Sequence, residues 1–181
     1  PSCAIFSSAS RRRCGWPELR CSATVEPEEC GGSAGIHVRV FVAGATGALG
    51  QALVSRLVED RHAVRLEPVD ADPLADDLRE LVRGCDAVVA ASMRTAATRR
   101  LLTVAVACGV PRYVQQSFAA VYRDGGERWL DEDAPLVETA PPFVRCRAAI
   151  ETEAMIRSIS PQTLAWTILR GMFGGNPEAK P

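Results

Sequence analysis

A run of glycines after an apolar segment constrains this chain more than any other feature of its sequence. Residues 37–43 read HVRVFVA and lead directly into GATGALG at residues 44–50. A short run of β-branched and aromatic residues predicts a buried strand. Beyond the glycines, apolar residues recur at helical spacing over residues 48–59, at Leu49, Leu53, Val54, Leu57 and Val58. The sequence therefore predicts a strand, a glycine turn and an amphipathic helix in succession.

The three glycines of this turn have separate predicted roles. Gly44 permits a tight turn out of the strand, Gly47 lets the backbone approach a ligand without a Cβ, and Gly50 allows the helix to pack closely on the strand. A pyrophosphate would then face the free N–H groups and the positive dipole end of the helix. In a strand–turn–helix context this spacing predicts a site for NAD or NADP. The alternative is a glycine loop that holds no ligand.

The residue that ends the next predicted strand bears on the choice of cofactor. Glu67 follows Gly44 by 23 positions, which is close to the spacing of a carboxylate that binds the ribose 2′-hydroxyl. Such a carboxylate would repel a 2′-phosphate, so it favours NAD over NADP. The alternative is a solvated charge at the end of a strand.

Alternating apolar strands and helices follow along the chain. Strands are predicted over residues 63–67, 85–91, 113–117 and 163–169, and helices over residues 73–83, 95–108 and 144–158. This alternation predicts an α/β fold, a Rossmann-type doubly wound parallel sheet with helices on both faces. Parallel neighbours need a crossover of about a dozen residues or more. Residues 63–72 cannot hold two such strands, so we expect the sheet to be abbreviated near its second and third strands, on the adenine side.

The composition excludes several classes of protein. The chain is 47% hydrophobic and 24% charged, with a net charge of −1. A balanced charge argues against nucleic acid or an anionic membrane as the main partner, and no apolar run approaches the roughly 20 residues of a membrane-spanning helix. The seven cysteines lack zinc-site spacing and only two histidines accompany them. We therefore expect no metal site and a reducing, cytoplasmic location.

The predicted domain lies between two ends of different composition. Residues 1–35 are rich in Ser, Arg, Gly and Cys without periodicity, which predicts a disordered extension, with an organelle-targeting segment as the alternative. Residues 36–176 are expected to form the dinucleotide-binding domain, and residues 177–181 a tail. Because the chain ends soon after the last predicted strand, we expect a fragment or processed product that is truncated at its C-terminus and lacks most of a substrate domain.

Four segments resemble the extended or atypical short-chain dehydrogenase/reductase superfamily, in its NAD-dependent epimerase/dehydratase branch. Residues 40–50 resemble the glycine signature of that family, residues 84–89 its fourth strand, residues 108–114 the approach to its fifth, and residues 168–174 its sixth strand and the following turn. The resemblance implies a sheet of order 3-2-1-4-5-6, NAD(P) as cofactor and a small-molecule substrate that it does not identify.

The resemblance also assigns the cofactor contacts by position. The pyrophosphate would lie on the three glycines, with Thr46 and Leu49 in the same turn. Asp70 would approach the adenine, and Ala91 would lie near the nicotinamide ribose.

The family's catalytic Ser/Thr, Tyr and Lys are all replaced in this sequence. Phe118 stands where the Ser/Thr is expected, with Ser117 beside it, while Phe143 and Arg147 stand in place of the Tyr and Lys of Y-x-x-x-K. In this chemistry the tyrosine hydroxyl passes a proton while a hydride moves, and phenylalanine has no such proton. The sequence leaves three interpretations open: an atypical NAD(P)-dependent reductase or epimerase-like enzyme, a non-catalytic dinucleotide-sensing protein, and an incomplete gene product.

Overall fold

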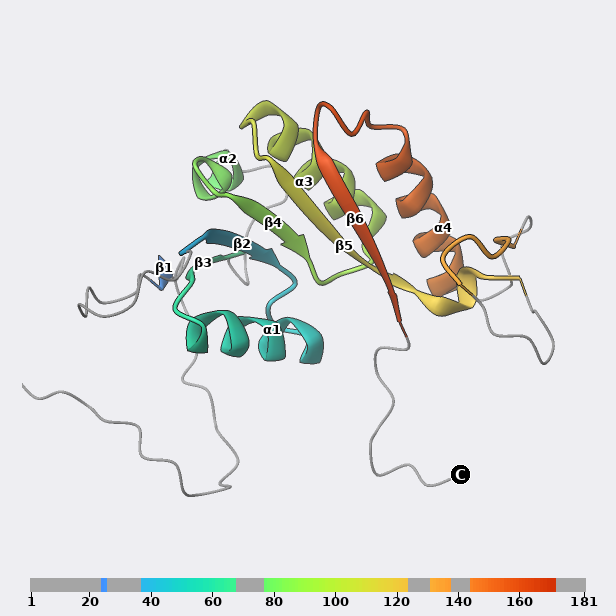
Figure 1. Ribbon diagram of the computed structural model, residues 1–181, viewed down its shortest axis with the longest axis horizontal. Helices are drawn as coiled ribbons and strands as arrows, with labels where there is room; N and C mark the ends of the chain where they lie inside the picture. Colours follow the sequence, from blue (N-terminus) through green and yellow to red (C-terminus); the bar gives the residue numbers. More distant parts are fainter. Residues whose placement is uncertain (1–23, 26–36, 68–76, 124–130, 138–143, 172–181) are drawn as a thin grey trace, which may run out of the picture.

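The computed structural model describes residues 24–25, 37–67, 77–123, 131–137 and 144–171, which form one sheet with flanking helices (Figure 1). The strands are β1 Thr24–Val25, β2 Arg39–Ala43, β3 Ala63–Leu66, β4 Ala87–Ala90, β5 Arg112–Phe118 and β6 Ala165–Gly171. The helices are α1 Ala48–Glu59, α2 Asp77–Val82, α3 Thr95–Ala107 and α4 Val144–Arg157, with a short 3-10 helix, η1, at Ala119–Val121. The predicted Rossmann-type fold is confirmed.

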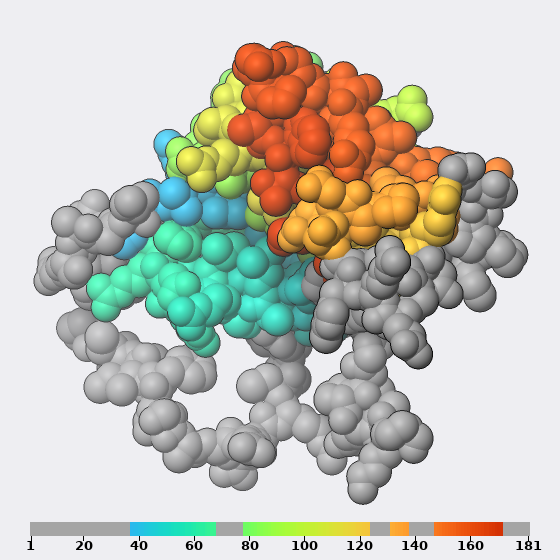
Figure 2. Space-filling view, turned by 45° about the vertical axis from the view of Figure 1, so that its right-hand side comes forward, coloured from blue at the N-terminus to red at the C-terminus, as the bar shows by residue number. Residues whose placement is uncertain are grey.

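Two apolar clusters show how the helices cover the sheet. Alternate residues of a strand point to opposite faces, and β2 separates accordingly. Val40 and Val42 join Val54 of α1 in one cluster, while Phe41 and its neighbours on the same face pack with α3 and with Ile156 of α4. The space-filling view shows α1 in the lower part of the described surface and β6 with α4 in the upper part (Figure 2). One face of the sheet is therefore covered by α1, and the other by α2, α3 and α4.

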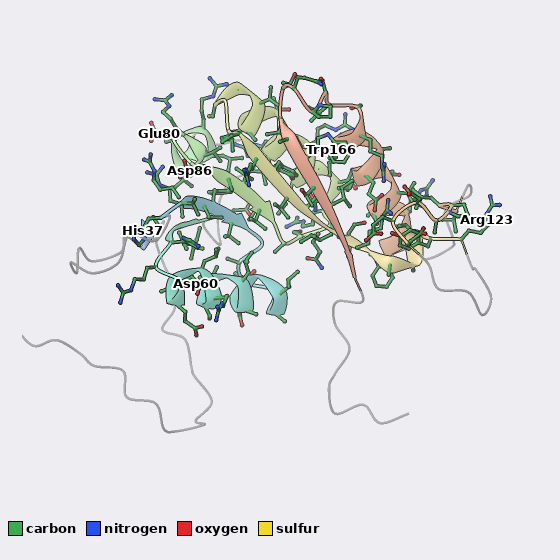
Figure 3. All side chains as sticks on the ribbon, in the orientation of Figure 1. His37, Asp60, Glu80, Asp86, Arg123 and Trp166 are labelled. Carbon is green, nitrogen blue, oxygen red and sulfur yellow. The ribbon has the colours of Figure 1, made fainter. Side chains whose placement is uncertain are left out.

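The parallel strands bring their carboxyl ends to one edge of the sheet. β2 pairs in parallel with β3 and with β4, β4 pairs with β5, and β5 pairs with β6. Ala43 is opposite Ala90 in this register. Asp86 lies at the other edge, where its carboxylate accepts the backbone N–H of Arg39 at 2.7 Å (Figure 3). The glycine turn, which follows β2, therefore lies at the carboxyl edge, where α/β sheets of this kind bind ligands.

The sheet order corrects one expectation that the resemblance carried. The observed order is β1-β3-β2-β4-β5-β6, and the place of the expected third Rossmann strand is taken by β1, which runs antiparallel to β3 with Thr24 opposite Arg65. A short antiparallel strand can pair with an open edge without the long crossover that a parallel strand needs. Part of the segment 1–35 therefore belongs to the sheet, which its lack of periodicity did not predict.

The other predicted elements agree closely with the structure. Where a predicted strand or helix lies wholly within the described residues, its ends fall within two residues of those observed. The first residues of the predicted helix 73–83 lie outside the described part, and α2 begins at Asp77. None of the helices in the described part is both long enough and apolar enough to cross a membrane.

Candidate functional site

Gly44 begins the turn in a conformation that favours glycine. Its φ is +77°, in the left-handed region, and a Cβ built on it would lie 2.8 Å from the carbonyl oxygen of Ala91. The end of β4 therefore packs directly against this residue. The fold itself requires glycine at position 44.

Gly50 is needed for a different reason. It lies in the first turn of α1, where an added Cβ would be 2.2 Å from the carbonyl oxygen of Gly44 and 2.8 Å from the Cα of Ala45. No rotamer relieves such a contact, because both neighbours are backbone atoms. The absence of a side chain lets α1 lie close against the end of β2, as the spacing predicted.

Gly47, in contrast, is not required by its surroundings. Its φ of −76° suits any residue, and an added Cβ would meet only the carbonyl oxygen of Gly44, at an ordinary contact distance of 3.6 Å. The residue is exposed at the carboxyl edge of the sheet. The turn is therefore open at the position where a diphosphate would approach the backbone most closely.

The N-terminus of α1 provides unpaired donors at the same place. The first bond of this helix runs from the N–H of Gln51 to the carbonyl of Gly47 at 2.9 Å, so the three preceding N–H groups have no intrahelical acceptor. Gly47 is the N-cap and supplies no side-chain bond, and the first turn contains no acidic residue. Gln51 also donates to the carbonyl of Thr46 at 3.0 Å, which holds the turn in shape. This arrangement attracts an anion.

Glu67 and Ala91 lie on either side of the turn. The Glu67 carboxylate accepts the backbone N–H of Gly44 at 3.2 Å from the β3 side. From the β4 side, the N–H of Ala91 donates to the carbonyl of Ala43 at 2.9 Å. The structure thus brings together the turn residues and both flanking residues that the sequence singled out, with Leu49 half-buried in the first turn of α1. Asp70 lies outside the described residues.

A buried charge cluster lies farther along the carboxyl edge, and we call it the Glu153 cluster. Glu153 of α4 accepts the hydroxyl of Ser117 at 2.5 Å, and the Arg170 guanidinium donates to its two oxygens at 2.9 and 2.6 Å. Arg170 also donates to the hydroxyl of Tyr122 at 2.8 Å. Burial raises the pKa of Glu153, but the hydrogen bonds from Arg170 and Ser117 outweigh it, so the net pKa lies below its ordinary value. Glu153 is therefore ionised and fully partnered.

The cluster changes how the predicted catalytic positions are understood. Ser117 is 1% exposed and its hydroxyl proton is donated to a carboxylate, so the side chain is committed to structure. Phe118 is half-buried, and Arg147 is exposed with Glu151 at 3.6 Å. Phe143 lies outside the described residues. Among the described positions, Ser117 is bonded to Glu153 and Arg147 is paired with Glu151, so these two side chains have different partners.

Sequence reasoning did not identify the Glu153 cluster, although one signal was present. Glu153 lies four positions after Ala149 and three before Ile156, and both of these residues are buried in α4. A carboxylate within the apolar stripe of a helix indicates a buried partner. One ion pair is local, since Arg157 lies 3.7 Å from Glu153 one turn farther along α4. The two hydrogen-bond partners, Ser117 and Arg170, come from β5 and β6, and helical spacing gives no sign of them.

The comparisons with known proteins agree with this geometry. A family model described as NAD(P)H-binding matches residues 44–179. The chain belongs to this NAD(P)H-binding family. It is also similar to a 3-diazoavenalumate denitrifying reductase from a Streptomyces species, with 33% identity over 170 residues that cover 74% of this chain and 55% of that protein. The chain thus spans about half the length of this curated relative.

Solved structures with the same fold carry NAD. A short-chain dehydrogenase/reductase superfamily protein from Agrobacterium tumefaciens with bound NAD is 26% identical, with a TM-score of 0.60 over 73% of this chain and 48% of that one. A UDP-glucuronic acid 4-epimerase from Bacillus cereus, in complex with UDP-glucuronic acid and NAD, is 17% identical, with a TM-score of 0.60 over 73% of this chain and 55% of that one. A tyrosine-to-phenylalanine variant of this epimerase, in complex with NAD and UDP-4-deoxy-4-fluoro-glucuronic acid, matches at 18% identity, a TM-score of 0.60 and the same coverage. The predicted superfamily and the NAD(P) cofactor are confirmed.

Proposed function

We propose that this chain is the cofactor-binding domain of an NAD(P)H-dependent reductase, with the pyrophosphate held over the N-terminus of α1. The open space at Gly47 carries the proposal. The fold does not require glycine at this position, whereas a side chain would stand between the turn and a diphosphate. The unpaired N–H groups of the first helical turn, with no acidic residue among them, supply the attraction.

Glu67 supports NAD as the preferred cofactor. Its carboxylate is held against the turn by the N–H of Gly44, where it can accept a ribose hydroxyl and repel a 2′-phosphate. The change Glu67→Gln retains an oxygen for Gly44 but removes the charge. We expect it to raise the affinity for NADPH relative to NADH by roughly tenfold, which corresponds to about 1.4 kcal/mol. An unchanged affinity ratio in parallel titrations would argue against this role for Glu67.

The replaced catalytic positions favour a hydride transfer that needs no proton donor. Phe118 and Phe143 carry no exchangeable proton, and the hydroxyl of Ser117 is donated to Glu153. Reduction of a carbonyl group to an alcohol consumes a hydride and a proton, so it requires an acid at the oxygen. An arenediazonium ion requires only the hydride, because the ion and NAD(P)H give the arene, N₂ and NAD(P)⁺ with atoms and charge balanced.

The Streptomyces relative supports this class of substrate. By its name it is a denitrifying reductase of a diazo compound, and hydride reduction of a diazonium ion needs no proton from the replaced catalytic positions. We therefore propose an arenediazonium ion, or another cationic hydride acceptor, as the substrate class of this protein. In the epimerase neighbour, a tyrosine-to-phenylalanine variant still holds NAD, so in that protein the loss of a tyrosine is compatible with cofactor binding.

The same replacements support a second candidate, a protein that senses the dinucleotide without chemistry. Its only requirement is the turn and its flanking residues, and it makes no use of a hydride acceptor. The two candidates differ in turnover, since the sensor binds NAD(H) and oxidises none of it.

One experiment tests the site and separates the candidates. NADH is titrated calorimetrically into the unmodified chain and into Gly47→Val, and both proteins are then mixed with NADH and an arenediazonium salt while NADH loss and N₂ release are measured. We expect binding and equal amounts of oxidised NADH and released N₂ from the unmodified chain, with only the uncatalysed background from Gly47→Val. Absence of NADH binding to the unmodified chain would refute both candidates. Binding without turnover leaves the sensor.

A further inference from the structure

Gln115 is a fully buried polar residue whose amide group reaches the main chain at the end of β4. Its Nε2 donates to the carbonyl of Ser92 at 2.7 Å and to that of Gln116 at 2.9 Å, with the carbonyl of Ala90 at 3.5 Å. Its Oε1 accepts the hydroxyl of Tyr113 at 2.9 Å. Gln115 and Tyr113 are both 0% exposed. The side chain thus joins β5 to the segment that follows β4.

The orientation of this amide is determined by its partners. Carbonyl oxygens only accept hydrogen bonds, so the NH₂ group of Gln115 must face Ser92 and the Gln116 carbonyl. The amide oxygen then faces Tyr113, whose hydroxyl must be the donor. Burial raises the pKa of Tyr113, which keeps this hydroxyl protonated. Every polar atom of the amide is therefore satisfied, and each would be costly to leave unpaired.

The segment that Gln115 holds also touches the glycine turn. A Cβ at Gly44 would lie 2.8 Å from the carbonyl oxygen of Ala91 and 3.1 Å from the Cβ of Ser92. Ala91 is bonded to the end of β2 through its N–H. Ala91 and Ser92 are therefore fixed between the turn on one side and the Gln115 amide on the other.

The position of Glu67 indicates which half of a dinucleotide would meet this segment. Glu67 approaches the turn from β3, and β4 lies on the opposite side of β2. A dinucleotide spans the crevice at this point of the sheet, with its adenine ribose beside the carboxylate. The nicotinamide half would then extend over the end of β4, past Ala91 and Ser92.

We propose that Gln115 is a positioning residue for the nicotinamide half of the cofactor, because its amide sets the backbone position of Ala91 and Ser92 beside the glycine turn. This inference rests on the proposed dinucleotide site. It assigns a role to a residue that does not touch the cofactor. Its effect is therefore tested by comparing a ligand that has the nicotinamide half with one that lacks it.

The test compares NADH with ADP, which has the pyrophosphate and adenosine but lacks the nicotinamide half. In Gln115→Met, a side chain of similar length fills the space but donates no hydrogen bond. We expect the affinity for NADH to fall about tenfold while that for ADP changes by less than about twofold. Equal losses for both ligands, or no loss for either, would overturn the inference.

Two further variants keep the result interpretable. Ile156→Val removes one methyl group from α4 in the same buried core, so it controls for a small loss of packing, and neither affinity should change. Ser92→Gly loosens the segment without removing a buried partner of Gln115, and it should show the same selective loss for NADH. If Gln115→Met does not fold, this second variant decides.

The outcomes for the unmodified chain and for the variants are distinct. An unmodified chain that binds neither NADH nor ADP would refute the proposed dinucleotide site and the role of Gln115 with it. An unmodified chain that binds both ligands, with an unchanged ratio of affinities in Gln115→Met and Ser92→Gly, would overturn the role of Gln115 alone.

Discussion

Two of the three glycines in the turn are required by the fold, and the third is not. Gly44 adopts a positive φ and Gly50 lies against the backbone of the preceding strand end, so both are fixed by geometry inside the protein. Gly47 has room for a side chain. A glycine without a structural requirement, at the centre of an otherwise constrained turn, points to something outside the chain that needs the space.

This difference predicts that two similar substitutions have unequal effects on stability. Gly50→Ala should lower the free energy of unfolding by roughly 1–3 kcal/mol, because its Cβ would lie 2.2 Å from a carbonyl oxygen. Gly47→Ala should change that free energy by less than about 0.5 kcal/mol, because its Cβ makes only an ordinary contact. Urea denaturation followed by circular dichroism measures both. Equal losses of stability would show that Gly47 is structural too.

The sequence revealed the glycine turn but not the residues that support it. The reason is the sequence separation between those residues and their partners. The turn is a local pattern that lies next to its own strand and helix, so spacing alone identifies it. Gln115 bonds to Ser92, 23 positions away, and Glu153 to Arg170, 17 positions away. Two adjacent glutamines, 115 and 116, also hide which of them faces inward.

At the scale of elements, one ion pair fixes α4 to the end of β6. The Glu153 and Arg170 side chains are 2% and 9% exposed and make two direct bonds. Burying two charges has a desolvation cost that good geometry roughly offsets, so the net gain from such a pair is small. Removing one partner is different, because it leaves the other charge buried and unpaired. The pair therefore specifies the position of α4 more than it adds stability.

Glu153→Gln should lower the free energy of unfolding by about 3 kcal/mol or more, since it leaves the Arg170 guanidinium buried without a counter-charge. Glu151→Gln, on the same helix, is the matched control. Its side chain is 54% exposed and its contact with Arg147 is long, so its loss should be no more than about 0.5 kcal/mol. Urea denaturation compares the two variants, and a loss of similar size in both would contradict the role assigned to the buried pair.

The lowered pKa of Glu153 also predicts how stability depends on pH. The carboxylate is favoured in the folded state, so its contribution is complete above the ordinary value of 4.5 and is lost as the pH falls through the lower folded value. The stability difference between the unmodified chain and Glu153→Gln should therefore be constant near neutral pH and shrink below about pH 4.5. Urea titrations across this pH range measure the difference in free energy of unfolding. A difference that widens in acid would contradict the predicted direction.

Local periodicity predicted most of the elements because each buries a continuous apolar face. β1 has only two residues and follows no pattern of its own. Its pairing is determined by the open edge of β3. Residues 63–72 are too few to supply a parallel strand that would cover this edge. The sequence therefore predicted that a parallel strand would be missing at this edge, but it did not predict that β1 would pair there.

At the scale of the whole molecule, the site lies where the topology changes direction. The chain leaves β2 toward β3 on one side and later reaches β4 on the other, so the turn after β2 lies between segments that diverge. Helix α1 presents its N-terminus there, Glu67 approaches from one neighbour and Ala91 from the other. A ligand bound at this point would contact three separate elements, and its binding energy would therefore be coupled to the folding of all three.

This coupling predicts that the cofactor stabilises the entire domain. A ligand that binds only the folded state adds stability by mass action, about 2.7 kcal/mol when its concentration is 100 times the dissociation constant. For a chain of 181 residues, that gain should raise the unfolding midpoint by roughly 5–10 °C. Differential scanning calorimetry should show this rise for the unmodified chain with NADH and none for Gly47→Val, although the two should unfold at similar temperatures without ligand. A rise of equal size in Gly47→Val would mean that NADH binds elsewhere, because the blocked turn could not then be its site.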